Sequence, residues 1–474
     1  MCLIFVRYYR SVASFYVENF GCRASQADGA AIEHQFEERG LQRACTASQA
    51  DFVVLNTCTV TAAADQDARA AIRRVHRFNP QCQIIVTGCY AQRAPAEIVS
   101  LPGVTMVVGN SHKHQLAQFA DAKAGHSFVP IASLARSDRE PIPIHVFDIF
   151  AHTELLAAPV FDASNERTRP NLKVQDGCDN RCSFCVIPSV RGQSRSLPLP
   201  NVLCEINRLV DSGYKEVVIS GINLGRWGLD LESQRAGITG LSGARRRGPR
   251  FEDLIGAILD ETELQKLRIS SVEPMDWSDE LIRLMASSPR VAKHSHVPLQ
   301  SGSDAVLRRM HRKYRPWHYR EKIEKIHALM PTAAIGADVM VGFPGETESE
   351  FEETRRLIQD LPFTYLHVFT YSPRPGTPAV AMANPVPVRI ARERNGILRD
   401  LAAQKKLGFM QSFVGRSIQA ITLNKSSEQG DSLFTEALTD NYLKLRLTGG
   451  HPANTWLTAN LYGIEEGVLL GSKA

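Results

Sequence analysis

Six of the ten cysteines stand at spacings that could hold metal, and they are the most informative chemical feature of the sequence. Three form the run Cys178-Asp-Asn-Arg-Cys182-Ser-Phe-Cys185, a C-x3-C-x2-C pattern. Three closely spaced thiolates can ligate three irons of a four-iron, four-sulfur cluster and leave the fourth iron open to a substrate. The alternative is a structural zinc site. A closed zinc site needs a fourth ligand, Cys or His, usually within about 20 residues, and no such residue follows before Cys204.

The other three cysteines, Cys22, Cys58 and Cys89, each follow a predicted strand by one to three residues. Strands and helices alternate there, which predicts a parallel, doubly wound sheet. Ligands of such sheets bind outside the carboxyl ends of the strands, so the three thiols should converge on one rim. Three unrelated buried cysteines are the alternative. We predict strands at Ser14–Asn19, Asp51–Asn56, Ile84–Thr87 and Val104–Val108, and helices at Ser25–Arg39 and Ala62–Arg77.

A second alternation of strands and helices runs from Asn171 to about Pro378 and predicts a parallel barrel or partial barrel. Each strand is followed by a polar or Gly/Pro-rich segment. Singly these segments are ordinary turn chemistry, but together with the cysteine loop they outline one site at the carboxyl end of the barrel. The six strands are predicted at Leu172–Gln175, Glu216–Ser220, Leu267–Ser270, His294–Pro298, Ile335–Val341 and Tyr365–Phe369. The candidate cofactor-binding residues in the following segments are Gly221, Asn223, Glu273, Gln300 and Asp338.

The length and composition fit a large cytoplasmic protein. The chain has 474 residues, which suggests about three domains, and 43% hydrophobic residues, enough for a sizeable core. The ten cysteines are too sparse for a disulfide scaffold. No apolar run approaches the roughly 20 residues of a membrane span, so no membrane partner is expected. The stretch Met1–Val6 lacks the basic residues that should precede a signal peptide's apolar core.

The carboxyl-terminal third suggests contacts with RNA, although the net charge is only +5. Residues 387–410 form a predicted basic helix. From Phe413 on, short strands predict a small β-barrel, with Leu443, Leu445 and Leu447 inward and Tyr442, Lys444 and Arg446 outward. A basic, aromatic outer face suits RNA, and an ordinary solvated face is the alternative. A second basic cluster comprises Arg308, Arg309, Arg312, Lys313 and Arg315, and the Arg-rich stretch Ala236–Gly248 is a predicted surface insertion.

Several motifs together resemble one enzyme family, the methylthiotransferase group of radical S-adenosylmethionine enzymes. The frame QDGCDNRCSFCVIP around Cys178 is similar to that group's cluster motif, and GC, NTC and TGC at Cys22, Cys58 and Cys89 resemble its auxiliary-cluster domain. PLQSGSDAVLRRM, DVMVGFPGETESEF and HVFTYSPRPGTPA are similarly close, and the resemblance runs from about Ala13. The sequence departs from the usual pattern at Arg23 and Ser25, at Thr370, and in the Arg-rich insertion.

The resemblance implies a three-part organisation. It comprises an amino-terminal methylthiotransferase domain at 13–125, a linker at 126–163, a radical core with a partial (βα)6 barrel at 164–396, and a small TRAM-like RNA-binding barrel at 404–470. It also implies two 4Fe-4S clusters and S-adenosylmethionine as cofactors. The Cys178, Cys182 and Cys185 cluster would generate a 5′-deoxyadenosyl radical. The Cys22, Cys58 and Cys89 cluster would carry the sulfur that a first S-adenosylmethionine methylates.

The segments RISSVEP and GINLGRWGLDL look most like the branch that converts N6-threonylcarbamoyladenosine to its 2-methylthio derivative beside the tRNA anticodon. The expected partners are then the tRNA anticodon stem-loop and an electron donor such as a flavodoxin or ferredoxin. Three alternatives stay open. One is the same chemistry on isopentenyladenosine or on a ribosomal-protein aspartate. The others are a non-catalytic iron–sulfur protein that binds RNA and a zinc-stabilised RNA-binding protein.

Overall fold

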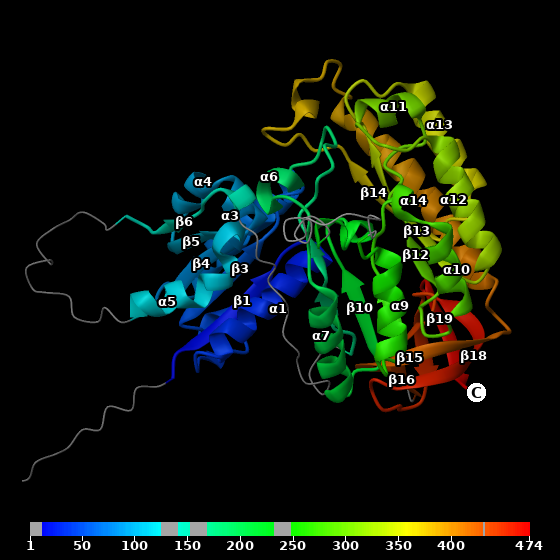
Figure 1. Ribbon diagram of the computed structural model, residues 1–474, viewed down its shortest axis with the longest axis horizontal. Helices are drawn as coiled ribbons and strands as arrows, with labels where there is room; N and C mark the ends of the chain where they lie inside the picture. The colour runs from blue at the N-terminus through cyan, green and yellow to red at the C-terminus, as the bar shows by residue number, and fades with distance from the viewer. Residues whose placement is uncertain (1–11, 125–140, 152–167, 232–247, 430–431) are drawn as a thin grey trace, which may run out of the picture. The chain divides into compact units, whose positions relative to one another are not determined.

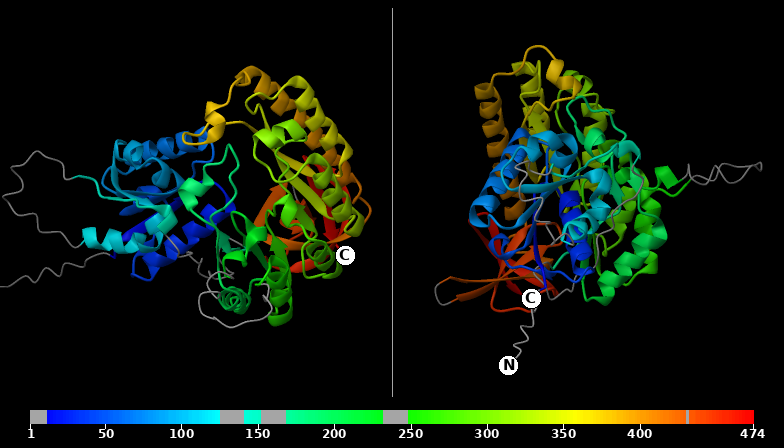
Figure 2. Two further views of the ribbon diagram at one scale, coloured as in Figure 1. Left: turned by 45° about the horizontal axis from the view of Figure 1, so that its top comes forward. Right: turned by 90° about the vertical axis from the view of Figure 1, so that its left-hand side faces the viewer.

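The computed structural model describes residues 12–124, 141–151, 168–231, 248–429 and 432–474. The chain divides into two compact units, which Figure 1 and the two further views of Figure 2 display. The first unit comprises Met1–Pro159 together with Ser189–Gly192, and the second comprises Val160–Pro188 and Gln193–Ala474. The predicted Arg-rich insertion, apart from Gly248, lies outside the described residues, as do residues 1–11.

The first unit contains a parallel sheet of six strands in the order β2-β1-β3-β4-β5-β6. The chain moves outward from β1 to β2 and then returns past β1 to β3, so the sheet is doubly wound, as predicted. The edge strands β2 and β6 are short and were not predicted. The elements are β1 (Ser14–Asn19), α1 (Arg23–Glu37), β2 (Gln42–Arg43), η1 (Ala47–Gln49), β3 (Phe52–Thr57), α2 (Ala62–Phe78), β4 (Gln83–Gly88), α3 (Cys89–Arg93), α4 (Pro95–Val99), β5 (Val104–Gly109), η2 (Asn110–Gln115), α5 (Leu116–Ala124), β6 (Ile144–His145) and η4 (Ile149–Ala151).

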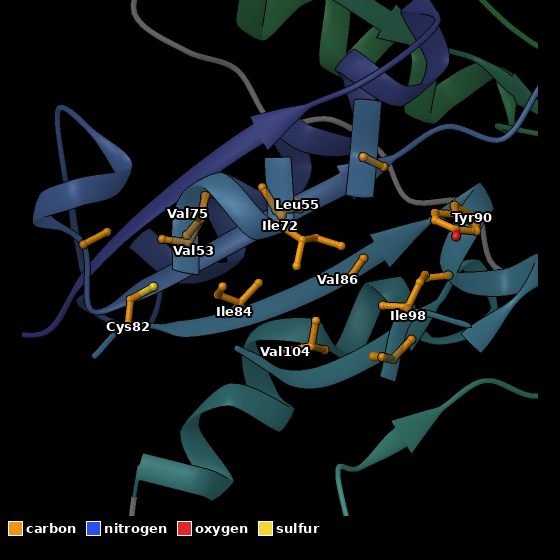
Figure 3. Close-up of a cluster of buried hydrophobic side chains, with 14 residues drawn as sticks. Val53, Leu55, Ile72, Val75, Cys82, Ile84, Val86, Tyr90, Ile98 and Val104 are labelled. Carbon is orange, nitrogen blue, oxygen red and sulfur yellow. The ribbon is translucent and has the colours of Figure 1, made fainter. Parts of the chain in front are cut away.

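The core of the first unit lies on both faces of the sheet. The six residues of β3 are all buried, as are five of the six in β4, because helices cover both faces of a doubly wound sheet. Figure 3 shows one of the two clusters, where Val53, Leu55, Ile84 and Val86 meet side chains of the covering helices. Cys82 belongs to this cluster and packs there as a small hydrophobic side chain.

The second unit begins with six parallel strands that form a partial barrel, as predicted. They make two three-stranded sheets, β11-β10-β7 and β12-β13-β14, and isolated bridges such as Ser271 to His296 join the sheets. The strands are β7 (Asn171–Lys173), β10 (Glu216–Ser220), β11 (Lys266–Ile269), β12 (His294–His296), β13 (Ala334–Val341) and β14 (Tyr365–Thr370), with β8 (Gln175–Asp176) and β9 (Arg195–Ser196) paired separately. The helices are α6 (Ile187–Arg191), α7 (Leu199–Asp211), α9 (Phe251–Glu261), α10 (Asp279–Ser287), α11 (Asp304–Arg309), α12 (Pro316–Leu329), α13 (Glu348–Asp360) and α14 (Val388–Gln411).

Local sequence explains how helices begin beside the barrel. Thr347 caps α13, since its hydroxyl accepts from the backbone of Glu350 while the Glu350 carboxylate accepts from the backbone of Thr347.

Gly336 in β13 leaves room for the Tyr365 ring, because a Cβ there would lie 2.0 Å from that ring. Short 3-10 turns lie in the segments that follow three of the barrel strands. They are η5 (Leu224–Arg226) after β10, η6 (Pro274–Asp276) after β11 and η7 (Pro378–Ala381) after β14.

The second unit ends in a closed five-stranded β-barrel in the order β15-β16-β17-β19-β18, which confirms the small barrel predicted there. Leu443, Leu445 and Leu447 are buried in its core, as the alternation predicted. None of the described helices is long and apolar enough to cross a membrane. The strands are β15 (Ser417–Gln429), β16 (Ser432–Thr439), β17 (Lys444–Thr448), β18 (Trp456–Glu465) and β19 (Val468–Lys473).

Candidate functional site

The cysteine loop of the second unit follows β8 and is held by its own backbone and by the segment after α11. Ser183, between two of the cysteines, is fully buried. Its N–H donates to the carbonyl of Met310 at 3.1 Å, and its hydroxyl donates to the carbonyl of Arg309 at 2.7 Å. The motif that contains Arg309 and Met310 therefore fixes the shape of the loop. This contact is a physical reason for the cysteine motif and the motif PLQSGSDAVLRRM to occur in one chain.

Two side chains direct N–H groups at the sulfurs of this loop. Arg312 donates to the Sγ of Cys182 at 3.2 Å, and Asn223 donates to the Sγ of Cys178 at 3.6 Å. Arg312 also forms an ion pair with Glu273. Hydrogen bonds to ligand sulfurs are a standard means by which a protein orients and tunes an iron–sulfur cluster. Of the predicted residues, Asn223 thus contacts the cysteine loop directly, and Glu273 is connected to the loop through Arg312.

Two thiols of the loop, those of Cys178 and Cys185, are poorly ionised without a cation. Burial raises the pKa of Cys185 to about 12 and also raises the pKa of Cys178. At neutral pH both groups would carry protons, and a metal centre would have to displace them. The chemistry of these donors therefore fits a group that brings positive charge into the loop.

The remaining predicted cofactor residues lie on neighbouring segments. Gly221 packs against Gln175, since a Cβ on the glycine would lie 2.8 Å from the Gln175 side-chain oxygen. Gln300 adopts a φ of 64°, and its backbone N–H donates to the carbonyl of Asp338 at 2.8 Å. Gln300 and Asp338 are therefore adjacent. Asp338 lies in β13, and Gln300 follows β12 and bridges to Val339 of β13, whereas Gly221 follows β10 in the other sheet.

A cluster of polar side chains inside the barrel was missed by the sequence analysis. His296, Asp338 and His367 place one ligand atom each within 4.8 Å of one another. The Nε2 of His296 lies 3.3 Å from Asp338, and its Nδ1 lies 2.8 Å from the hydroxyl of Ser271. Alternate positions along adjacent strands share a face, so the spacing of His294 and His296, and of Tyr365 and His367, could have indicated this cluster.

The three cysteines of the first unit lie at the carboxyl ends of three adjacent strands. Cys22 is the N-cap of α1, Cys58 follows β3, and Cys89 opens α3. Strands β1 and β3 are the neighbours between which the strand order reverses, which is where sheets of this kind bind ligands. Burial, together with the nearby Cys89 and Cys22, raises the pKa of Cys58 to about 12. All three cysteines therefore stand at the same edge of the sheet.

Among the described residues, neither set of cysteines forms a mononuclear metal site. The only group of three or more ligands found within 4.8 Å of one another is the histidine and aspartate cluster of the barrel. A tetrahedral zinc site with Zn–S bonds of about 2.3 Å would bring its sulfurs to within about 3.8 Å of one another. In neither set of cysteines do all three sulfurs lie that close together.

Some arginines of the two predicted basic surfaces are instead used inside the protein. In the second basic cluster, Arg312 is buried beside Cys182, so its assignment to an RNA-binding surface is wrong. Arg309 forms a bidentate pair with Glu350. In the basic helix, Arg394 is buried against Glu346. Their charges are neutralised by partners that lie far away in the sequence.

Tyr442 does not stand on the free outer face of the small barrel, contrary to the prediction. Its ring lies 5.1 Å from the guanidinium of Arg268 and 4.8 Å from the ring of His294. Arg268 is itself fully buried and paired with Glu216 at 2.6 Å. Tyr442 therefore attaches the small barrel to the larger one. An aromatic ring that is exposed is Tyr462 on β18, at 54%.

Comparisons with known proteins agree with this geometry. A family model described as "Uncharacterized protein family UPF0004" matches residues 14–109, and one described as "Radical SAM superfamily" matches residues 172–358. The chain is 35% identical over 444 residues to the threonylcarbamoyladenosine tRNA methylthiotransferase MtaB of Bacillus subtilis, covering 92% of this chain and 91% of the relative. It is 33% identical to the tRNA-2-methylthio-N(6)-dimethylallyladenosine synthase of a Parafrankia species, covering 92% and 84%.

One solved structure resembles the fold over most of the chain. It is the radical S-adenosylmethionine methyltransferase TsrM of Kitasatospora setae, with a TM-score of 0.53 and 14% identity. The likeness covers 78% of this chain and 74% of that one. At this identity the comparison supports the arrangement of helices and strands and nothing finer.

Proposed function

Because the chain belongs to the methylthiotransferase family of radical S-adenosylmethionine enzymes, we propose that it attaches a methylthio group to C2 of N6-threonylcarbamoyladenosine in tRNA. The observation that carries this choice is the set of relatives named for that reaction, at 31–35% identity over 84–96% of the chain. The two sets of three cysteines supply the chemical requirement. C2 of adenine bears no acidic proton, so acid and base groups alone cannot activate it.

Family membership implies a 4Fe-4S cluster and S-adenosylmethionine in the barrel. When bound, they supply a radical that can attack an unactivated carbon. In our proposal Cys178, Cys182 and Cys185 hold this cluster. Arg312 and Asn223 donate to its ligand sulfurs.

Four further residues of the barrel are proposed to surround S-adenosylmethionine. Glu273, held by Arg312, offers a carboxylate to the amino group. Gln300 and Asp338 offer polar groups to the ribose. Gly221 leaves the backbone open to close approach.

The second cluster is proposed for Cys22, Cys58 and Cys89, and its role is to carry the sulfur. Two thiols of this set are buried, and Cys22 is exposed. Three protein ligands leave one iron of a four-iron cluster without a protein ligand. A sulfur bound to that iron at the exposed side of the set would be accessible to a substrate.

RNA binding is proposed for the small barrel, with α14 beside it. The exposed groups that suit a phosphate backbone are Arg389, Arg392 and Arg399 of α14 and Lys444 of β17. The exposed ring of Tyr462 can stack on a base. We further propose a cytoplasmic location and an external one-electron donor such as a flavodoxin or ferredoxin, because each radical cycle consumes an electron.

The test uses the full chain with its clusters reconstituted anaerobically. It is given a reductant, S-adenosylmethionine and two tRNA substrates, one with threonylcarbamoyladenosine and one with dimethylallyladenosine. We expect 5′-deoxyadenosine and a methylthio product on the first substrate only. Product on the second substrate only would favour the reaction named for the Parafrankia relative. Absence of 5′-deoxyadenosine would favour a non-catalytic iron–sulfur protein.

A further inference from the structure

The side chain of Asn110 connects a cysteine of the first unit to a segment from much later in the chain. Asn110 opens η2, directly after β5. Its Nδ2 donates to the Sγ of Cys89 at 3.5 Å and to the carbonyl of Val190 at 2.8 Å. Val190 lies in Ser189–Gly192, which groups with the first unit and starts four residues after Cys185.

The orientation of this amide follows from its partners. The carbonyl of Val190 can only accept, so the atom 2.8 Å from it must be the Asn110 nitrogen and not the oxygen. The same nitrogen has a second hydrogen, and the Sγ of Cys89 is its acceptor. Exchanging the two amide atoms would place two acceptors against each other. The N–H to sulfur contact is therefore determined by the backbone of Val190.

The neighbouring residue of the same segment brings a buried positive charge. The guanidinium of Arg191 is 2% exposed and lies 3.0 Å from Asp28, which also pairs with Lys113 at 2.9 Å. Arg191 and Lys113 thus share one carboxylate. Arg191 also donates to the hydroxyl of Ser25 at 3.3 Å.

Ser25 lies between Arg191 and Cys22. Its hydroxyl lies 3.7 Å from the Sγ of Cys22. Arg191 is therefore linked to the sulfur of Cys22 through one hydroxyl group, while Asn110 contacts the sulfur of Cys89 directly.

We propose that Asn110 and Arg191 are positioning residues that raise the reduction potential of the cluster held by Cys22, Cys58 and Cys89. The inference rests on the proposed function for the presence of that cluster. A one-electron reduction adds negative charge to the cluster and its sulfurs. An N–H donor and a buried cation stabilise the more negative state, so they favour reduction. The segment that follows the radical-cluster cysteines in the chain would thus tune the sulfur-carrying cluster.

The test isolates one cluster in the full chain. Replacing Cys178, Cys182 and Cys185 by Ala removes the barrel cluster and leaves the spectrum of the other. The midpoint potential is then measured by a redox titration followed by electron paramagnetic resonance. Asn110→Leu removes the N–H donor at similar size, Arg191→Met removes the charge, and Arg191→Lys keeps it. Asn79→Leu is the matched control, because in the bonds described the side chain of Asn79 donates only to the carbonyls of Ala47 and Ala50.

We expect Asn110→Leu and Arg191→Met each to lower the ratio of reduced to oxidised cluster about tenfold at a fixed potential, equivalent to about 59 mV for one electron. Arg191→Lys should recover most of the shift, and Asn79→Leu should cause none. The electron paramagnetic resonance signal comes only from chains that hold a cluster, so incomplete reconstitution does not change the measured midpoint potential. If Asn110→Leu binds no cluster, Asn110→Ser takes its place.

Three outcomes would each overturn either this inference or the proposed second cluster. Unchanged midpoint potentials in loaded Asn110→Leu and Arg191→Met chains would refute this inference and leave the proposed function intact. A parent protein without the three barrel cysteines that binds no iron would refute the second cluster itself. A shift in Asn79→Leu as large as that in Asn110→Leu would show that the effect is structural, and would also refute the inference.

Discussion

Substitution of Gly21 by Ala should remove the cluster of the first unit while leaving the cluster of the barrel in place. Gly21 precedes Cys22 and has a φ of +100°. An added Cβ would lie 2.7 Å from the Cβ of Cys58 and 2.9 Å from its sulfur. Cys58 is only 6% exposed, so it has little space to move away.

Two costs add in this variant. The left-handed backbone costs a non-glycine residue about 1–2 kcal/mol. The steric contact is shorter by about 1 Å than an ordinary carbon–carbon contact, which adds roughly 1–3 kcal/mol of overpacking and displaces a ligand sulfur. Gly40 separates the two costs, since its φ is +78° and an added Cβ would meet nothing within 4 Å.

The assay counts iron and sulfide in anaerobically reconstituted protein and measures the free energy of unfolding in urea. Wild type and Gly40→Ala should bind about eight irons per chain, and Gly40→Ala should lose about 1–2 kcal/mol. Gly21→Ala should bind about four irons and lose more stability than the control. Full iron content in Gly21→Ala would refute the placement of a cluster against Cys58.

Three further changes test other parts of the structure. Arg312→Met removes the charged hydrogen bond to Cys182, worth about 1.5–3 kcal/mol, and also the ion pair with Glu273. 5′-Deoxyadenosine formation should therefore fall about 10- to 100-fold, by chromatography, with the iron of the first unit unchanged. Burial raises the pKa of Asp276 to about 6, so its protonated form stabilises the fold below pH 4 and this contribution is lost as the pH rises through 6. Asp276→Asn should therefore gain up to about 3 kcal/mol on wild type between pH 4 and pH 7, and a pH-independent difference in urea unfolding would contradict this. Arg268→Met leaves Glu216 buried and should cost on the order of 3 kcal/mol, whereas Arg356→Met, at an exposed pair, should change unfolding by less than about 1 kcal/mol.

The strands that the sequence predicted best are those with a strong local pattern. Continuous apolar runs such as Phe52–Leu55 mark strands buried on both faces, and the observed β3 differs from the prediction by one residue at each end. The edge strands β2 and β6 have two residues each, too few for any periodicity. They exist because a neighbouring strand offers free backbone groups, which is a tertiary property.

The site residues that could be predicted are those whose type and spacing indicate their chemistry. Residues whose role depends on burial in the folded protein could not be predicted. The cysteine loop and the three strand ends are visible in the sequence because the residue type itself indicates the chemistry. Arg312 and Tyr442 look like members of basic and aromatic surfaces. Their partners, Cys182 and Arg268, are more than 100 residues away, so only the fold shows that both are used internally.

The most direct test of the central claim is nucleoside mass spectrometry of tRNA from a strain that lacks this protein. The account predicts that 2-methylthio-N6-threonylcarbamoyladenosine disappears, that unmodified N6-threonylcarbamoyladenosine accumulates, and that any 2-methylthio-isopentenyladenosine is unchanged. Restoring the wild-type chain should restore the methylthio nucleoside, and a chain with Cys185→Ala should not. Persistence of 2-methylthio-N6-threonylcarbamoyladenosine in the deletion strain would contradict the proposed function.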